Sequence, residues 1–324
     1  MRVFITGAAS PLGRAVVAAL VERGHRVLGL ARRRTGLTLI RELGADPIAG
    51  DVRRPGDWAH HVAGCDTVYH LATYFDFWSS QPDIFTQVNI EGTRHTMAAA
   101  AAAGVRRVVL CSTALTRALP GIDAQRKRAR RTRPVTAFES SARIAERLAL
   151  QLRPRGIEVV IVHPSLVVAP ADPGWTGRLI ASRVRGRQQL AARATMGWVW
   201  VEDAAEGVVR AGERGRNGAQ YIISGELASS HAFLSQVAAR AGTAPPRALP
   251  PSLALGEAAL STVLARPFGR RPRYAVDEMR FLAAGFRVDG RQAARELDFE
   301  YTPPSQYMSG LVDSYRKALA RFAR

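Results

Sequence analysis

The sequence predicts an α/β fold: a doubly wound parallel sheet with a smaller, mainly helical C-terminal domain. Short apolar runs of strand length alternate with helical patterns through the first half of the chain, as in sheets built from strand–helix–strand units. The segment after Leu227 has helical patterns and many prolines. The length of 324 residues suits one large and one smaller domain better than a single core.

Seven strands and four helices are expected to build the larger domain. The strands are predicted over residues 2–6, 26–31, 46–50, 67–71, 107–112, 158–163 and 221–224. The helices are predicted over residues 12–23, 84–103, 137–152 and 202–213. Gly24 and Gly104 follow the first two helices, where glycine commonly ends a helix. We therefore assign residues 1–168 and about 195–226 to the larger domain, and residues 169–194 and 227–324 to the smaller one.

The net charge of +19 raises the question of a nucleic-acid partner. All but two of the 46 basic residues, Lys127 and Lys317, are arginine, and the arginines are spread over the whole chain. This bias resembles the amino-acid usage of a GC-rich genome. No helix-turn-helix pattern, zinc-ligand spacing or cluster of stacking aromatics accompanies it. We expect no nucleic-acid partner and no metal.

The cellular setting is predicted from the absence of targeting patterns. The chain has no run of about 18 uncharged apolar residues that would span a membrane, and no membrane partner is expected. Met1 leads directly into the first predicted strand, which leaves no room for a signal peptide. Cys65 and Cys111 lie on different predicted elements and give no disulfide framework. We expect a reduced, cytoplasmic protein.

A glycine-containing turn joins the first predicted strand to the first predicted helix. It reads Thr6-Gly7-Ala8-Ala9-Ser10-Pro11-Leu12-Gly13. Glycine lets the backbone come close to a pyrophosphate, which then meets the exposed N–H groups at the helix N-terminus. At a strand-to-helix junction of this kind, the pattern predicts a Rossmann-type dinucleotide site formed by Gly7, Ser10, Pro11, Leu12 and Gly13.

The chain resembles the extended short-chain dehydrogenase/reductase family, which includes sugar epimerases, dehydratases and dihydroflavonol-type reductases. Thr6, Gly7 and Gly13 match the family's TGxxGxxG, with Ser10 replacing the middle glycine. Further matches follow in the family's order: Gly50-Asp51-Val52 for GDL/GDV, His70-Leu71-Ala72 for HLA, Asn89-Ile90-Glu91-Gly92-Thr93 for NVxGT, Cys111-Ser112-Thr113 for SSS/T, His163-Pro164 for RP, and Val201-Glu202-Asp203-Ala204-Ala205 for VDDVA. The resemblance implies cofactor contacts at Asp51, Val52, Leu71, Ala72 and Pro164. It also implies a homodimer built on the helices around residues 84–103 and 137–152.

Cofactor choice is predicted from the end of the second strand. An acidic residue there binds the ribose 2′-hydroxyl of NAD, whereas arginine pairs with the 2′-phosphate of NADP. The segment reads Leu30-Ala31-Arg32-Arg33-Arg34 and contains no carboxylate. Arg32 and Arg33 therefore predict NADP, with NAD less favoured, although arginines in such a basic chain also suit a solvated surface.

The family's acid–base pair is missing. Its YxxxK motif places tyrosine and lysine on one helix face, where the lysine charge lowers the phenol pKa. The matching helix has Phe138 and Ala142 at these positions, while Ser141, Ala145 and Glu146 keep the register of YxxSKxxAE. No tyrosine anywhere in the chain is followed four residues later by lysine.

Three residues are candidates to replace the lost groups. Thr113 occupies the family's Ser/Thr position and suits a hydrogen bond to a substrate oxygen, or simply to backbone. Tyr74 and Asp76 lie in the aromatic segment after the fourth strand, where related enzymes line the substrate pocket. They could act as acid or base, or belong to an apolar wall. We name Thr113, Tyr74 and Asp76 as the candidate catalytic set.

A dense basic segment runs from Arg126 to Arg133 and is the least expected feature of the chain. It is either a dock for an anionic partner, such as a carrier-bound substrate, or a solvated loop. The leading hypothesis is an NADP-binding enzyme with a non-standard acid–base set. Its reaction is a reduction, an epimerisation or dehydration, or a redox-neutral step such as a cyclisation. The alternative is a catalytically inactive NADP-binding redox sensor.

Overall fold

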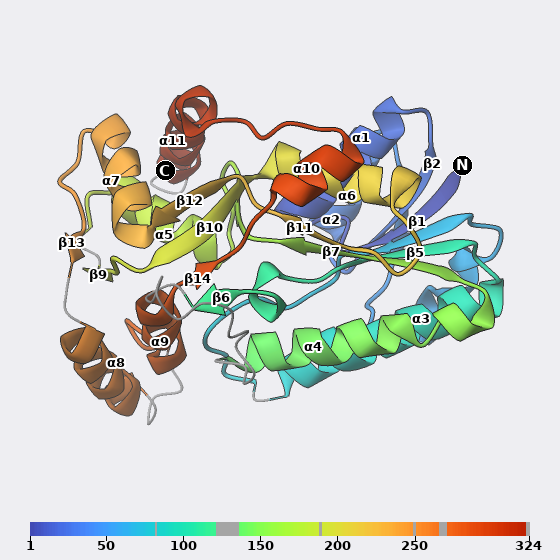
Figure 1. Cartoon of the computed structure of the whole chain (residues 1–324), viewed down its shortest axis with the longest axis horizontal. Helices are drawn as coiled ribbons and strands as arrows, with labels where there is room; N and C mark the ends of the chain where they lie inside the picture. Colours follow the sequence, from blue (N-terminus) through green and yellow to red (C-terminus); the bar gives the residue numbers. More distant parts are fainter. Residues whose placement is uncertain (82, 121–135, 188–189, 249–250, 266–270, 322–324) are drawn as a thin grey trace.

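A seven-stranded parallel sheet forms the centre of the computed structural model, which describes residues 1–324 except 82, 121–135, 188–189, 249–250, 266–270 and 322–324 (Figure 1). The strands are β1 (Arg2–Thr6), β2 (Arg26–Ala31), β3 (Asp46–Ala49), β4 (Thr67–His70), β5 (Arg107–Cys111), β7 (Glu158–Pro164) and β11 (Gln220–Ile223). Each predicted strand is confirmed to within one residue at either end. The sheet confirms the doubly wound α/β prediction.

The strand order in the sheet is β11-β7-β5-β4-β1-β2-β3, and all neighbours are parallel. The order reverses between β1 and β4. The connection after β1 leads to β2 on one side, and the connection after β4 leads to β5 on the other side. In such sheets the crevice outside the carboxyl ends of the strands, at this switch point, binds the ligand. We therefore expect a ligand site among the segments that follow β1, β2, β4 and β5.

Helices cover both faces of the large sheet (Figure 1). One face carries α1 (Pro11–Glu22), α2 (Arg34–Glu42) and α6 (Val201–Arg214), and the other carries α3 (Gly92–Ala103) and α4 (Ala137–Leu150). The helix expected over residues 84–103 divides into a π-helical turn, Thr86–Glu91, and α3. Helix α2 was not predicted, because its sequence contains a glycine and two β-branched threonines and its first turn has no acidic residue.

The smaller part is mainly helical, as predicted, but it also contains strands that the sequence did not reveal. A second sheet joins β12 (Glu226–Ser229), β10 (Thr195–Trp200) and β8 (Leu166–Val168). The helices are α5 (Trp175–Val184), α7 (Ser230–Ala241), α8 (Pro251–Ala265), α9 (Val276–Ala284) and α11 (Pro304–Arg321). Two short pairs, β9 (Leu190–Ala191) with β13 (Arg247–Ala248) and β6 (Leu119–Pro120) with β14 (Phe286–Arg287), complete it. The sequence predicts residues 166–168 and 195–200 as part of the larger domain, whereas β8 and β10 pair with each other in the second sheet.

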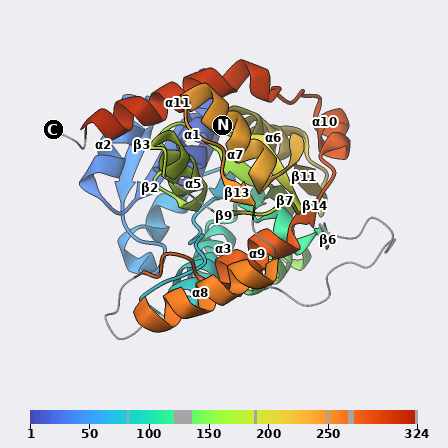
Figure 2. The same cartoon turned by 90° about the vertical axis from the view of Figure 1, so that its left-hand side faces the viewer.

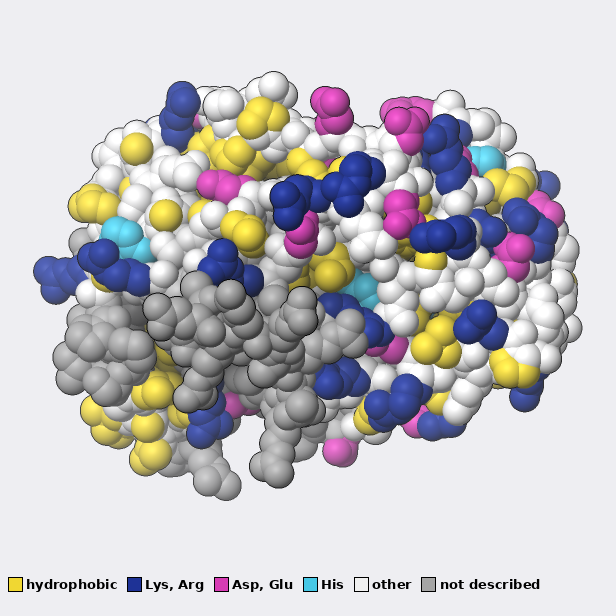
Figure 3. Space-filling model, viewed as in Figure 1, with side chains coloured by type: hydrophobic (Ala, Val, Ile, Leu, Met, Phe, Trp, Pro, Cys, Tyr) yellow, Lys and Arg dark blue, Asp and Glu magenta, His cyan; other side chains and the backbone are white. Residues whose placement is uncertain are grey.

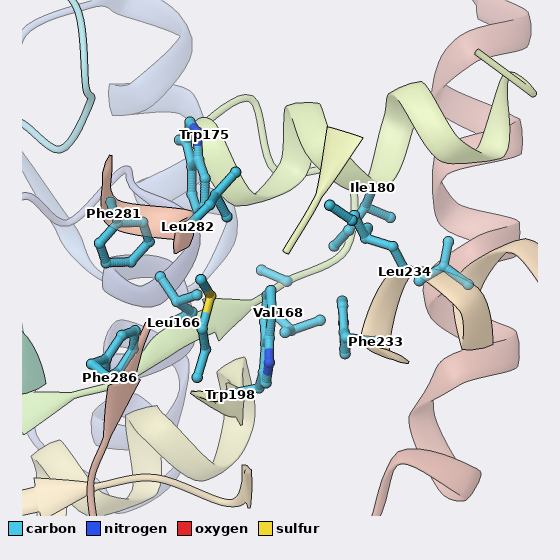
Figure 4. Close-up of a cluster of buried hydrophobic side chains, with 14 of the residues drawn as sticks. Leu166, Val168, Trp175, Ile180, Trp198, Phe233, Leu234, Phe281, Leu282 and Phe286 are labelled. Atoms are coloured by element: carbon cyan, nitrogen blue, oxygen red, sulfur yellow. The ribbon is translucent and has the colours of Figure 1, made fainter. Parts of the chain in front are cut away.

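Aromatic residues fill the core of the smaller part (Figure 4). The rings of Trp198 and Phe233 stack with their centroids 4.1 Å apart, and both side chains are buried. Trp175 of α5 and Phe281 of α9 meet edge to face at 5.7 Å. Because large rings bury much apolar area, this core fixes α5, α7 and α9 around the second sheet.

The chain crosses between the two parts more than once. After β14 it returns to the large sheet as α10 (Arg291–Leu297), which packs on α6 and β11 (Figures 1 and 2). The Thr302 backbone and hydroxyl both donate to the Asp203 carboxylate, at 2.8 and 2.7 Å, before α11 goes back to α5 and α7. The last 40 residues therefore bind the two parts together. None of the helices in the described ranges is long and apolar enough to cross a membrane.

Candidate functional site

The predicted glycine turn is tightly packed against the neighbouring strand β4. Gly7 has a φ of +72°, and a Cβ there would lie 2.7 Å from the Leu71 carbonyl carbon and from the Ala72 nitrogen. A Cβ on Gly13 would overlap the Gly7 carbonyl oxygen and lie 2.9 Å from Ser10 Oγ. Both positions therefore require glycine. The turn, Leu71 and Ala72 are brought together, as the predicted dinucleotide site needs.

Ser10, which replaces the family's middle glycine, is the N-cap of α1. Its Oγ accepts a hydrogen bond from the Gly13 backbone N–H at 3.0 Å, and Pro11 occupies the first helical turn. Leu12 points inward, between the cores of the two parts. A small side chain that caps the helix leaves the N-terminal end of α1 facing the crevice, where an anion is favoured. Pro164 ends β7 beside β11.

A series of buried hydrogen bonds connects the strand before this turn to β4 and α3. Thr6 Oγ1 lies 2.7 Å from His70 Nδ1 and accepts from the Ala72 N–H, while His70 Nε2 lies 2.9 Å from Thr93 Oγ1. Thr93 in turn donates to the Asn89 carbonyl at 2.6 Å. Since the Thr93 proton is used there, His70 Nε2 must donate and Nδ1 must accept. The histidine is neutral, and complete burial lowers its pKa to about 4.

This buried histidine predicts a loss of stability in acid. The folded-state pKa of about 4 lies below the usual value near 6.5. His70 therefore contributes stability that is fully present above pH 6.5 and is lost as the pH falls toward 4, by about 3 kcal/mol in total. Denaturant unfolding measured at several pH values in this range gives the free energy of unfolding as a function of pH. In His70→Gln this free energy should fall less steeply as the pH is lowered. The same dependence on pH in wild type and variant would contradict the assignment.

At the far end of the crevice, Arg32 and Asp51 come together with a residue that the sequence analysis missed. Arg53 binds the Asp51 carboxylate through Nη2 at 2.7 Å, and Arg32 Nη1 lies 3.8 Å from the same carboxylate. Burial alone would raise the pKa of Asp51, but the bonds and charges of Arg53 and Arg32 outweigh it and lower the pKa. Two arginines on one carboxylate leave a net positive charge. Arg33 is exposed at the start of α2, and Val52 is buried.

Helix α4 carries apolar groups where the family has its acid–base pair. Phe138 and Ala142 are both buried, at 5% and 7% exposure, and they line a cavity of about 20 Å³ together with Asn89, Ser112 and other residues of β4, β5 and α3. A space of this size holds about one water molecule. Asn89 Nδ2 donates to Ser141 Oγ at 2.9 Å, which fixes α4 against the loop after β4.

The aromatic segment after β4 forms an apolar wall over Phe138. The centroid of the Phe75 ring lies 4.7 Å from that of Phe138 and 5.9 Å from that of Trp175. Phe77 contacts Trp175 at 4.9 Å and Phe281 at 4.7 Å. This wall extends from the large sheet into α5 and α9. Phe77, Trp175 and Phe281 are buried in it, and Phe75 is half-buried.

Asp76 lies between these two phenylalanines but faces charged partners. Its carboxylate accepts from Arg178 of α5 at 2.7 Å and, in two bonds of 2.7 and 2.8 Å, from Arg271. Burial alone would raise the pKa of Asp76, yet Arg271 and Arg178 outweigh it and lower the pKa. Such a carboxylate is disfavoured as a proton donor. Asp76 instead connects the loop after β4 to the smaller part.

Tyr74 is less constrained than Asp76. Its backbone N–H donates to Asn89 Oδ1 at 2.7 Å, which holds the loop. Its hydroxyl makes one long hydrogen bond, 3.5 Å, to the Trp78 carbonyl, and its ring meets Phe85 edge to face. A bond of that length is weak, so the hydroxyl can exchange it for a substrate at little cost.

Thr113 follows β5 and begins a short turn. Its Oγ1 accepts from the Leu115 N–H at 3.3 Å, which leaves the hydroxyl proton able to meet another acceptor. Behind it lies a polar cluster that the sequence did not reveal. Ser112 donates to Glu146 at 2.5 Å, and the completely buried His163 lies 3.5 Å from the same carboxylate. Burial holds the pKa of His163 below its usual range.

Two further expectations concern charge and metal. The basic segment from Arg126 to Arg133 lies outside the described residues. Among those that are described, no group of three or more His, Cys, Asp or Glu side chains is placed to hold a metal ion.

The comparisons with known proteins agree on one family. A model of the NAD dependent epimerase/dehydratase family matches residues 3–224. A putative dihydroflavonol 4-reductase from Synechocystis sp. (strain ATCC 27184 / PCC 6803 / Kazusa) is 29% identical over 322 residues, which cover 96% of this chain and 92% of the relative. Sterol demethylase protein B from Methylococcus capsulatus (strain ATCC 33009 / NCIMB 11132 / Bath) is 30% identical, with 98% and 99% covered. A solved structure of gox2253 is 31% identical with a TM-score of 0.80, and 98% of each chain is covered.

Proposed function

The chain belongs to the NAD dependent epimerase/dehydratase family, and on that premise we propose that it is an NADP-binding enzyme that acts on a small molecule without the family's Tyr–Lys pair. One observation carries the proposal. The turn that cradles a dinucleotide is intact, down to two glycines that admit no Cβ, whereas Phe138 and Ala142 are buried and apolar. When bound, NADP supplies or accepts a hydride.

We propose reduction of a lipophilic carbonyl compound as the reaction. Two relatives that this chain matches over more than nine tenths of their length are a putative dihydroflavonol 4-reductase and a sterol demethylase protein B. The half-buried ring of Phe75, which packs on Phe138 and Trp175, offers apolar contact to such a substrate. The test is loss of NADPH absorbance with a panel of steroid and alkyl ketones. Turnover on none of them, despite tight NADPH binding, would reject the proposal.

Different roles are proposed for the three candidate residues. Thr113 holds the substrate oxygen with its free hydroxyl proton, and Tyr74 is the proton donor, because its only described hydroxyl bond is long. Asp76 positions the loop through Arg178 and Arg271 rather than exchanging a proton. General acid help is worth roughly 10²–10⁴-fold, so Tyr74→Phe should lower kcat by up to that factor with KM little changed.

NADP is expected to bind at least about tenfold more tightly than NAD, a difference of about 1.4 kcal/mol. The support is the positive charge that Arg32 and Arg53 leave beside Asp51. Calorimetry on Arg32→Ala should show the preference reduced. Arg26→Ala is the matched control, because Arg26 lies at the opposite end of the same strand and is exposed. Equal affinities for both cofactors in the wild type would exclude the prediction.

The contrasting proposal, an inactive NADP-binding sensor, keeps one observation in its favour. The two positions that should exchange protons are packed in apolar surroundings. A sensor predicts NADPH binding without turnover, and no effect of Tyr74→Phe on any output. The ketone panel therefore separates the two.

We propose a homodimer on the two helices that the family resemblance implies. α3 and α4 lie side by side on one face of the large sheet (Figure 1), and α3 is rich in alanine, which permits close approach. Light scattering at micromolar concentration should give twice the mass of the chain. A monomer mass would refute the proposal.

A further inference from the structure

Helix α8 carries the most exposed apolar side chains of the described residues. Leu260, Val263 and Leu264 are 61%, 67% and 62% exposed, more than any other large hydrophobic residue described. Their spacing of three and four residues puts them on one helix face. Figure 3 shows the hydrophobic side chains gathered at the corner of the molecule where α8 lies in Figure 1. A contiguous patch of this kind marks a binding surface.

The other side of the helix explains why it stays attached to the protein. Ala258 is completely buried, and Ser261 Oγ accepts from the Tyr274 backbone N–H at 3.4 Å. α8 packs against α9, which lies beside it in Figures 1 and 2. The exposed face is therefore not needed to hold α8 in place, and something outside the chain is expected to cover it.

The charge around α8 identifies what covers it. Within residues 251–265 the sequence has one charged residue, Glu257. Such a helix, apolar on nearly every side, is normally buried in a core or in lipid. Arginines flank it in the sequence at 247, 266, 270, 271 and 273, in a chain of net charge +19. Arg247 and Arg273 are exposed in the structure, whereas Arg271 is paired with Asp76.

We propose that α8 binds the surface of an anionic lipid bilayer, with its apolar face in the acyl boundary and Arg247 and Arg273 at the headgroups. Arginine stems and charges suit that interface. A second copy of the chain fits less well. A two-fold antiparallel pairing of α8 would bring Arg247 of one copy toward Arg273 of the other.

This surface was not expected from the sequence analysis, which tested only for a segment long enough to span a bilayer. A helix that lies flat in the interface has no such length requirement. α8 adjoins α9, and Phe281 of α9 belongs to the aromatic wall of the candidate site. Delivery of a membrane-dissolved substrate by this route rests on the proposed function, whereas the membrane contact itself does not.

Sedimentation with lipid vesicles tests the proposal. The full chain should bind vesicles of phosphatidylglycerol and phosphatidylcholine, and at least about tenfold more weakly vesicles of phosphatidylcholine alone. The triple variant Leu260→Ser, Val263→Ser, Leu264→Ser should lose about tenfold or more on the mixed vesicles. Leu227→Ser is the matched control, because Leu227 is an exposed leucine on β12, away from α8. It should bind like the wild type.

Two further measurements keep the outcomes distinct. A tryptophan placed by Leu264→Trp should shift its emission to the blue with mixed vesicles, which binding through charge elsewhere on the surface would not cause. Unchanged binding of the triple variant, or no shift, would overturn the proposal. A wild-type dimer that the triple variant dissociates would assign the face to a second copy and overturn it as well. Turnover of a water-soluble ketone should be equal in wild type and triple variant, so a failed proposed function is recognised separately.

Discussion

Carbonyl reduction on a generic ketone should rise by about 10²–10⁴-fold when Phe138→Tyr and Ala142→Lys are added to the Tyr74→Phe variant, which lacks its own proton donor. These substitutions restore a phenol and an ammonium four residues apart on α4, next to the turn that begins at Thr113. A positioned acid of this kind contributes roughly 3–5 kcal/mol to the barrier. NADPH binding should stay intact, because neither position belongs to the glycine turn. Steady-state kinetics of NADPH oxidation measures the effect.

The single variants are the controls. Phe138→Tyr alone should give a smaller gain, because nothing then lowers the phenol pKa. Ala142→Lys alone should give none, and its melting temperature must be followed, because the cavity of about 20 Å³ beside Ala142 has room for about one water molecule and not for an aminobutyl chain. A combined variant that binds NADPH and stays inactive would show that the reacting carbonyl lies elsewhere. Brisk native reduction that survives Tyr74→Phe would reject Tyr74 as the proton donor.

Gly13→Ala is expected to abolish dinucleotide binding. The new methyl group would overlap the Gly7 carbonyl oxygen and crowd Ser10 Oγ at 2.9 Å, and both contacts belong to the turn itself. Backbone cannot give way as a flexible side chain does, so the start of α1 must move out of place. Overpacking of this kind costs about 1–3 kcal/mol or more in stability. Calorimetric titration with NADPH and thermal unfolding should both show the loss.

A second helical glycine separates this effect from the general consequences of changing glycine to alanine. Gly310 lies on α11 with no atom within 4 Å of an added Cβ. Gly310→Ala should bind NADPH normally and gain about 1 kcal/mol of stability, because alanine favours the helix. Normal cofactor affinity in Gly13→Ala would mean that the turn is not the dinucleotide site.

The large sheet was predictable from sequence because its central strands are buried on both faces, and such strands are short and rich in apolar residues. In β7, for example, every residue from Val159 to Pro164 is buried. The second sheet was not predictable in the same way. Nothing in the sequence of β10 tells whether Thr195–Trp200 pairs with β7 or with β8, since pairing is decided by the loops and by the aromatic core around it.

The candidate site was predictable where a motif is contiguous and not where partners are distant. The turn at Gly7 can be recognised from eight consecutive residues, Thr6 to Gly13. Asp76, by contrast, binds Arg178 and Arg271, which are 102 and 195 residues away. Because arginines occur throughout the sequence, it does not indicate which of them are the partners. The place of Asp76 after the fourth strand, where related enzymes line the substrate pocket, suggests a catalytic carboxylate, and only the fold supplies the two guanidinium groups that hold it ionised.

The late return of α10 to the large sheet has a consequence for synthesis on the ribosome. α1 packs on α6, and α10 packs on α6 in turn, so the layer over that face of the sheet draws on residues 11–22, 201–214 and 291–297. When β1 to β5 leave the exit tunnel, α1 and α2 have been translated but α6 and α10 have not. The nascent first half therefore exposes part of one apolar face of its sheet until α6 emerges, and that face is completed only with α10, near the end of synthesis.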